Sequence, residues 1–174
     1  MKKQRITKET AALALGIALL PPLWAVLSPY IGVTTGSVAL ICAGVYVANG
    51  NKAEDGLRIS LGFLSGDIWA VAALALLAAL PWGAAASLFV TLFVLGGAAV
   101  LLAALAPRFL YLPAWLCGWA VGMTILAPLG LAEIGSLPVQ IGVSMLMGVW
   151  YVGFGVDAFQ KMLLKDRRPA KDKI

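Results

Sequence analysis

Six long apolar segments, separated by short polar breaks, constrain this chain more than any other feature. Each has roughly the 20 residues that an α-helix needs to cross a hydrocarbon core of about 30 Å. We expect membrane-spanning helices at residues 11–27, 30–48, 57–80, 84–106, 109–129 and 137–159. Only 12% of the residues are charged, about half of what a soluble domain carries. The sequence therefore predicts an all-α, multi-pass membrane bundle of six helices in a lipid bilayer.

The thirteen Lys and Arg residues divide the breaks between these segments into two classes. They lie before the first segment, after the sixth, or in and beside the breaks that follow the second and fourth: Lys2, Lys3, Arg5, Lys8, Lys52, Arg58, Arg108, Lys161, Lys165, Arg167, Arg168, Lys171 and Lys173. The other three breaks, 28–29, 81–83 and 130–136, contain none. Basic residues mark the cytoplasmic side of a membrane protein. We therefore expect both termini in the cytoplasm, and five or seven spans would scatter the basic residues over both sides.

The organisation is that of one six-helix transmembrane domain over residues 1–174, ending in a basic cytoplasmic tail at 160–174. A β-barrel would show segments of about ten residues with alternating polarity, and these segments are twice as long and apolar throughout. The basic start followed by an apolar run resembles a signal peptide. Pro21 and Pro22 interrupt that run and no A-x-A cleavage pattern follows, so we interpret it as an uncleaved first span.

Three spans followed by three spans are compatible with an inverted repeat, an arrangement common in transporters. The third and sixth segments carry similar residues at equal spacing: Gly62, Gly66 and Trp69, then Ser144, Gly148 and Tyr151. Pairs of glycines four residues apart let helix backbones approach closely. We expect such packing at Gly32, Gly36, Gly62, Gly66, Gly118 and Gly122.

Asp67 is the candidate functional residue, because it lies eleven residues into the third segment, near the middle of the membrane. An ionisable residue at that depth is costly and is usually functional. Apart from Arg58 at the cytoplasmic start of the third segment, no Lys, Arg or His lies inside any segment to pair with it. Three possibilities stay open: Asp67 is protonated, it faces a water-filled cavity, or it holds a cationic solute or a proton in transit.

Several hydroxyls and deep tryptophans are candidates to line a pathway with Asp67. These residues are Ser65, Trp69, Trp119, Thr124, Ser144 and Trp150. Hydroxyls in membrane helices also bond to their own backbone, and tryptophans also serve packing, so each has a structural alternative. Together they predict a sparse polar lining for a small solute.

Other classes of function lack their motifs. The chain has no histidine, no phosphate-binding loop and no H-E-x-x-H motif, so we expect no enzyme, no metal site and no cofactor. The two cysteines lie within apolar segments, where cysteine usually acts as a small apolar residue. The net charge of +5 is concentrated at the ends of spans, where it fits orientation in the membrane, and we expect no nucleic-acid partner.

The stretch Leu64-Ser65-Gly66-x-x-Trp69, the glycine-rich second and fifth segments and the basic tail resemble the YcdZ-like family of small bacterial membrane proteins, domain-of-unknown-function family 1097. The resemblance covers most of the chain. It implies six helices and the bacterial inner membrane, and it implies no substrate.

Three functional hypotheses follow from the sequence. The first is an oligomeric channel or facilitator, a homo-oligomer that passes a small polar or cationic solute. The second is a secondary carrier coupled to protons through Asp67. The third is a partner protein that transports nothing and docks on a larger membrane complex.

Overall fold

The computed structural model describes residues 7–165, and every regular element within that range is helical. The helices are α1 (Lys8–Leu27), α2 (Val38–Ala48), α3 (Gly56–Ala79), α4 (Ala84–Leu105), α5 (Leu112–Leu126), α6 (Leu137–Met147) and α7 (Gly155–Lys165). Two short 3₁₀ turns, η1 (Ser28–Ile31) and η2 (Ala53–Asp55), precede α2 and α3. A π-helix, η3 (Gly148–Phe154), joins α6 to α7 without a break.

Four of these helical stretches are long and apolar enough to cross a membrane: Lys8–Ile31, Ala53–Ala79, Ala84–Leu105 and Leu137–Leu164. Large apolar side chains stay exposed along them; on α4, Phe93 is 72% exposed and Leu105 is 82% exposed. Such surfaces suit a lipid environment and not water. The described chain is therefore an all-helical protein of membrane type, as the sequence predicted.

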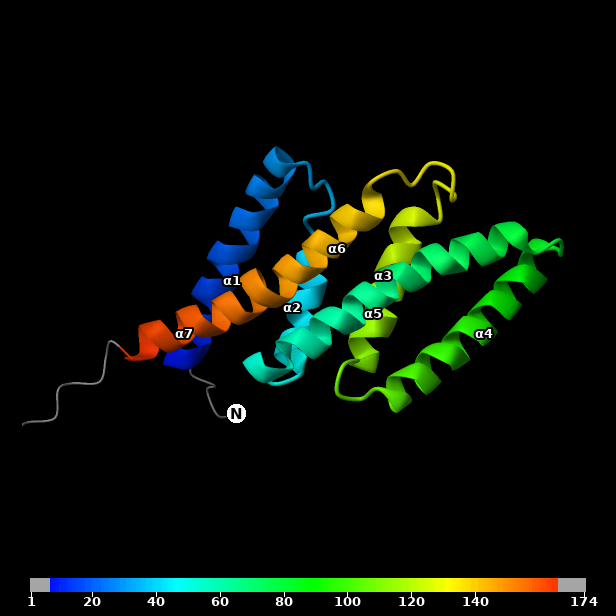
Figure 1. Cartoon of the computed structure of the whole chain (residues 1–174). Coiled ribbons are helices and arrows are strands. Elements are labelled where there is room, and N and C mark those ends of the chain that lie inside the picture. The colour runs from blue at the N-terminus through cyan, green and yellow to red at the C-terminus, as the bar shows by residue number, and fades with distance from the viewer. Residues whose placement is uncertain (1–6, 166–174) are drawn as a thin grey trace, which may run out of the picture.

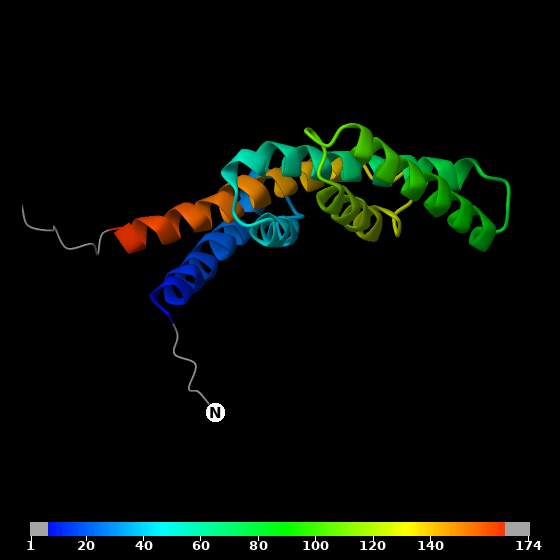
Figure 2. The ribbon, with the colours of Figure 1, turned by 90° about the horizontal axis from the view of Figure 1, so that it is seen from below.

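The helices form an elongated row, with α1 and α7 at one end and α4 at the other (Figure 1). Helices α3 and α6 pass each other in opposite directions through the middle of the row. The view from below shows the same order, with α4 at the far end (Figure 2). The start of α1 and the end of α7 lie on the same side of the row, which we call the terminal side.

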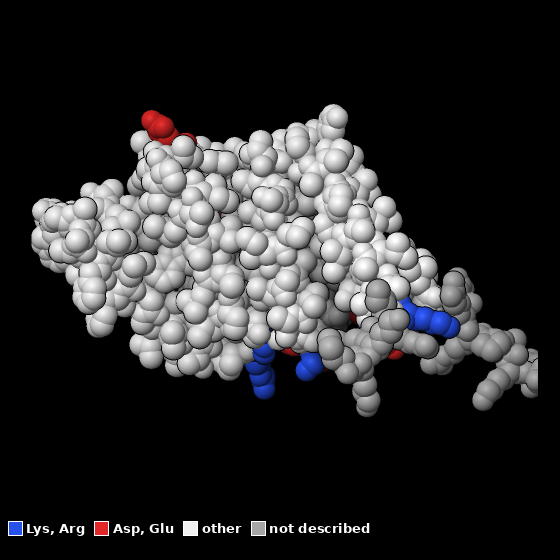
Figure 3. All heavy atoms as spheres, turned by 180° about the vertical axis from the view of Figure 1, so that it is seen from behind, with Lys and Arg blue, Asp and Glu red and all other residues white. Residues whose placement is uncertain are grey.

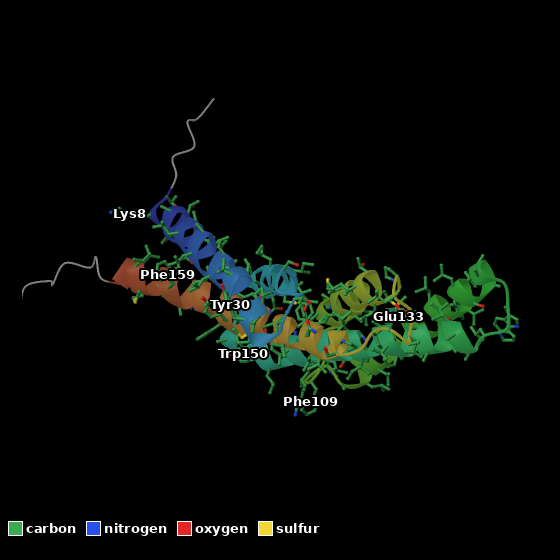
Figure 4. All side chains as sticks on the ribbon, turned by 90° about the horizontal axis from the view of Figure 1, so that it is seen from above. Lys8, Tyr30, Phe109, Glu133, Trp150 and Phe159 are labelled. Carbon is green, nitrogen blue, oxygen red and sulfur yellow. The ribbon has the colours of Figure 1, made fainter. Side chains whose placement is uncertain are left out.

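Charged side chains follow this division of sides. On the face drawn in Figure 3, Lys and Arg gather along the terminal edge and an acidic side chain projects from the opposite edge. The loop between α5 and α6 lies on that opposite side (Figure 1), and it carries Glu133, which is labelled in the view from above (Figure 4). Seven of the basic residues used to predict the orientation lie outside the described residues: Lys2, Lys3, Arg5, Arg167, Arg168, Lys171 and Lys173.

The second segment differs from its prediction, because its α-helix begins at Val38 and not at residue 30. Gly32 adopts a φ of +78°, which ends the η1 turn. The following backbone is held by side chains instead of a helix: the Trp24 indole donates to the Gly36 carbonyl at 3.1 Å. The backbone N–H of Thr34 donates to Gln140 Oε1 at 2.9 Å. Apolar composition could not reveal these long-range bonds, so the predicted helical start was wrong.

The fifth segment is also shorter than predicted: α5 covers Leu112–Leu126, where we expected 109–129. Pro113 fits the first turn of the helix, where a missing N–H costs nothing. After Leu126 the chain turns, and Gly130 adopts a φ of +74°. Helices α2 and α5, with 11 and 15 residues, are therefore the two short members of the bundle.

The central contact is a parallel seam between α3 and α5, built on glycines. A Cβ added to Gly118 would lie 2.5 Å from the Phe63 carbonyl oxygen, and one added to Gly62 would lie 2.7 Å from that of Tyr111. A Cβ on Gly66 would collide with the Trp115 carbonyl. The backbones therefore touch directly, which maximises van der Waals contact where no hydrophobic effect drives association.

A second parallel seam joins α2 to the α6–η3 helix. A Cβ on Gly148 would collide with the Ala39 carbonyl, and one on Gly153 would lie 2.7 Å from the Tyr46 ring. Tyr46 is fully buried there. Two glycines of the second half thus play the same structural role as those of α3.

The predicted packing glycines do not all behave alike. Gly36 and Gly122 are tightly enclosed, the first by the Ser28 hydroxyl and the second by Ala70 Cβ at 2.5 Å. Gly32 is different, because nothing lies within 4 Å of the position a Cβ would take. Its glycine serves the left-handed turn before α2, and the prediction that it packs between helices was wrong.

Replacing Gly66 or Gly148 by Ala should destabilise the protein, because each new Cβ meets a backbone carbonyl that cannot move away. Overpacking of this kind costs about 1–3 kcal/mol. Thermal unfolding of the purified protein in detergent measures the effect. Gly44 is the matched control, since nothing lies within 4 Å of a Cβ there. Gly44→Ala should be neutral or stabilising by up to about 1 kcal/mol, the helix-propensity difference. A Gly66→Ala protein as stable as Gly44→Ala would contradict the close seam.

Candidate functional site

Asp67 lies where α3, α5 and α6 meet, and it is only 6% exposed. Its Oδ1 lies 3.4 Å from the position of a Cβ on Gly122 of α5, and its Oδ2 lies 3.9 Å from that of Gly142 of α6. The carboxyl group therefore faces a glycine on both neighbouring helices. The missing side chains of Gly122 and Gly142 leave the room that this polar group occupies in an apolar bundle.

The Asp67 carboxylate has little to compensate its burial. Among the described residues Oδ1 accepts no hydrogen bond. The two ion pairs of the described chain, Arg58–Asp55 and Lys161–Asp157, involve other carboxylates near the terminal side. An ionised carboxylate isolated in this way costs several kcal/mol. The site therefore calls for a proton, a cation or a hydrogen-bond donor.

Among the predicted pathway residues, Trp119 packs against the residue next to Asp67. A Cβ on Gly66, the neighbour of Asp67, would lie 2.5 Å from the Trp119 backbone nitrogen. Trp119 is 8% exposed, and its Nε1 also has no hydrogen-bond partner among the described residues. The junction of α3 with α5 thus contains an unpaired acceptor and an unpaired donor.

Two predicted pathway residues make their side-chain contacts with other segments and not with Asp67. Ser144 is buried and its hydroxyl lies 3.1 Å from that of Thr35, on the α2 side of α6. Trp69 donates its Nε1 to the Leu95 carbonyl of α4 at 3.0 Å. Its ring also stands edge-on to Trp115, with centroids 5.1 Å apart.

The remaining three lie elsewhere again. Thr124 is exposed and donates to the Ala120 carbonyl of its own helix at 2.8 Å. Trp150 donates to the Ser60 hydroxyl at 3.0 Å, nearer the terminal side than Asp67. Ser65 is half-buried. The predicted residues therefore do not form one continuous polar lining in the single chain.

Two apolar grooves open on the outer surface, and Asp67 lines neither. One of about 240 Å³ lies between α1, α2 and the η3–α7 helix, and the other, of about 450 Å³, lies between α2 and α5. Ser37 and Thr124 are among the residues that line the second groove. Asp67 is 6% exposed and is therefore largely shielded from the surface in this structure.

Three features of the site were not selected from the sequence. Gly142 looked like any other glycine of an apolar segment, and only its position opposite Asp67 distinguishes it. Ser60 was hidden at the start of a span, where a serine attracts no attention. The π-helix η3 has no sequence signal that distinguishes it from an α-helix, although π-helices often mark functional sites.

The fold and site define a helical protein of membrane type with an enclosed carboxyl group. A family model described as "Protein of unknown function (DUF1097)" matches residues 14–161. The chain belongs to this family, as the sequence resemblance indicated. Searches of curated proteins and of solved structures gave no match.

Replacing Asp67 by Asn should leave the fold intact and should not lower its stability. The substitution keeps the shape and removes a buried group that can carry an uncompensated charge. Residues kept for function rather than stability commonly behave this way. Thermal unfolding in detergent at neutral pH provides the measurement, with Glu133→Gln in the exposed loop as the matched control. A loss above about 1 kcal/mol, the value of a typical hydrogen bond, would show that Asp67 is structural.

Proposed function

We propose that this chain is a six-span membrane transport protein that acts as a secondary carrier for a small polar or cationic solute. In this proposal Asp67 holds the transported cation or the coupled proton. Both termini lie in the cytoplasm and the protein resides in the bacterial inner membrane. The positions of the basic residues and the family resemblance support the orientation and the location.

The observation that carries the proposal is the buried Asp67 carboxyl group, which is flanked by Gly122 and Gly142 and whose Oδ1 has no hydrogen-bond partner among the described residues. A buried carboxyl without a partner is expensive, so it persists where a mobile ligand completes it during a working cycle. A proton or a small cation can do so in a space left by two glycines. A purely structural aspartate would instead be paired or hydrogen-bonded.

The lengths of α2 and α5 add independent support. With 11 and 15 residues they extend about 16 and 22 Å, less than the hydrocarbon core of about 30 Å. Short or interrupted helices in corresponding places of the two halves of a membrane protein point to a transport site. Helices α2 and α5 are the second helix of each half, and Asp67 contacts the face of α5 that carries Gly122.

A carrier fits this geometry better than an open pore, because Asp67 is only 6% exposed in the single chain. An oligomeric channel is the second candidate. The groove between α2 and α5, which Ser37 and Thr124 help to line, supports it. A second copy of the chain packed over this groove would turn it into a closed path.

Solute uptake into proteoliposomes tests the proposal, using native protein, Asp67→Asn and the control Glu133→Gln across a range of pH and a panel of small cations and polar solutes. For a carrier coupled through Asp67, native protein and Glu133→Gln should respond to a pH gradient, and Asp67→Asn should lose this response.

Two other results separate the alternatives. Flux that persists in Asp67→Asn and does not depend on pH would support the channel. An absence of flux for every solute, with the protein purifying together with another membrane protein in fixed ratio, would overturn transport in favour of a docking partner.

A further inference from the structure

The two glycine seams share one contact pattern. On the α3–α5 seam, Gly62 meets Tyr111 and Gly66 meets Trp115. On the seam between α2 and α6, the Ser144 hydroxyl meets Thr35 and Gly148 meets Ala39. In both seams the two contacts are four residues apart in the sequence of each segment, with Tyr111 just before α5 and Thr35 in the non-helical stretch before α2.

A third contact extends the pattern through the π-helix. Ala70 meets Gly122 on the first seam, and Gly153 meets Tyr46 on the second. Gly122 and Tyr46 are each seven residues beyond the previous contact. Ala70 follows Gly66 by four residues while Gly153 follows Gly148 by five, which fits the extra residue that a π turn contains.

The outer helices α1 and α4 also occupy equivalent places in the two halves. Helix α1 packs on α7, where a Cβ added to Gly16 would lie 3.0 Å from Val156 Cγ1. Helix α4 packs on α3, where Trp69 bonds to Leu95. A half-turn about an axis perpendicular to the page of Figure 1 exchanges α1 with α4, α2 with α5 and α3 with the α6–α7 helix. That axis lies in the membrane plane, so the halves have opposite orientations.

We infer that the chain is an inverted repeat and that it has two solute-binding stations, one in each half. The first station is Asp67 with Gly142. The second is Ser60 with Trp150, where Ser60 is the repeat counterpart of Gly142 and Trp150 follows the counterpart of Asp67. Ser60 lies six residues before Gly66, and Gly142 lies six residues before Gly148. The repeat therefore exchanges Ser60 with Gly142. It likewise exchanges Asp67 with Val149, the neighbour of Trp150.

The new station has the chemistry that a small polar or cationic solute needs. Ser60 is 3% exposed, and its hydroxyl accepts the hydrogen bond of the Trp150 indole at 3.0 Å. Trp150 is 40% exposed and lies between the two ends of the row (Figure 4). Rotation of its ring away from Ser60 would leave a hydroxyl and an aromatic face that suit a cation or a hydrogen-bonding solute.

The two stations lie at different depths in the bundle. Ser60 is four residues from the terminal-side end of α3, about 6 Å at 1.5 Å per residue. Gly142 is five residues from the opposite end of α6, about 8 Å. Phe63 and Met145 lie between the stations; the repeat exchanges these two residues, and both are fully buried. They form an apolar barrier near the axis.

This inference rests on the proposed transport function and adds the path that the solute takes through the protein. The solute binds at Asp67 from the side opposite the termini, and at Ser60 and Trp150 from the terminal side. During transport each half adopts the packing that the other half had. This change moves the Phe63–Met145 barrier from one side of the bound solute to the other. We place this change at the π-helix η3 between α6 and α7, because π-helices are frequent at functional sites.

Cysteine labelling tests this route without requiring flux. Cys42→Ala and Cys117→Ala remove the native thiols, and single cysteines are placed at the equivalent positions, as Ser60→Cys and Gly142→Cys. A membrane-impermeant thiol reagent is then added from each side of oriented vesicles. We expect Gly142→Cys to react only from the side opposite the termini, and Ser60→Cys only from the terminal side.

A disulfide tests whether the two accesses exclude each other. The Thr35 and Ser144 hydroxyls are 3.1 Å apart, so Thr35→Cys with Ser144→Cys should form a bond that closes the α2–α6 seam. If the two accesses exclude each other, closing this seam should favour access from the terminal side. In the Ser60→Cys protein, the disulfide should therefore increase labelling from the terminal side, and reduction should reverse the increase. Unchanged labelling would overturn the exchange of packing.

The results also separate the repeat from the transport proposal. Labelling of both single cysteines from one side, or of neither, would overturn the second station even if flux depends on Asp67. Labelling from opposite sides without any flux would support the repeat and overturn transport. Size-exclusion profiles check folding, and Leu64→Cys replaces Gly142→Cys if that protein aggregates, because Leu64 Cδ2 faces Gly142.

Discussion

The direct contact of the α3 and α5 backbones is the interaction on which the rest of this structure depends. Gly66 and Gly118 bring the main chains together so closely that no side chain fits between them. The contact fixes the rotation of α3, and this rotation points Asp67 at α5 and α6. A bundle in lipid gains no hydrophobic stabilisation from bringing its helices together. Close packing must therefore supply both the stability and the orientation of the site.

The sequence predicted the long helices well, because residues that disfavour a helix, such as proline and glycine, mark their ends. Pro81 and Gly83 separate α3 from α4, and α4 was expected at 84–106 and is found at Ala84–Leu105. Asp67 was identified as a buried carboxyl from its depth in a span. Both predictions needed only local composition and length.

The short helices and the surroundings of the site could not be predicted in this way. An apolar stretch shows that a segment tolerates hydrocarbon, and it does not show that the segment is helical. Residues 32–37 leave the helical conformation because Trp24 and Gln140, which are distant in sequence, satisfy their backbone. Helix rotation was equally hidden, since spans that are apolar on every side carry no marked face. For that reason Thr124 and Trp69 could be chosen as pathway residues although the structure directs them elsewhere.

The depth of Asp67 has an electrical consequence. Eleven residues of the 24-residue helix α3 precede Asp67, so the carboxyl group lies near the middle of that helix. In the proposed carrier, a proton or cation that reaches Asp67 would cross part of the membrane potential, which is worth about 2.3 kcal/mol per elementary charge per 100 mV across the whole membrane. The direction of its movement would then depend on the membrane potential, without any charged voltage-sensing helix.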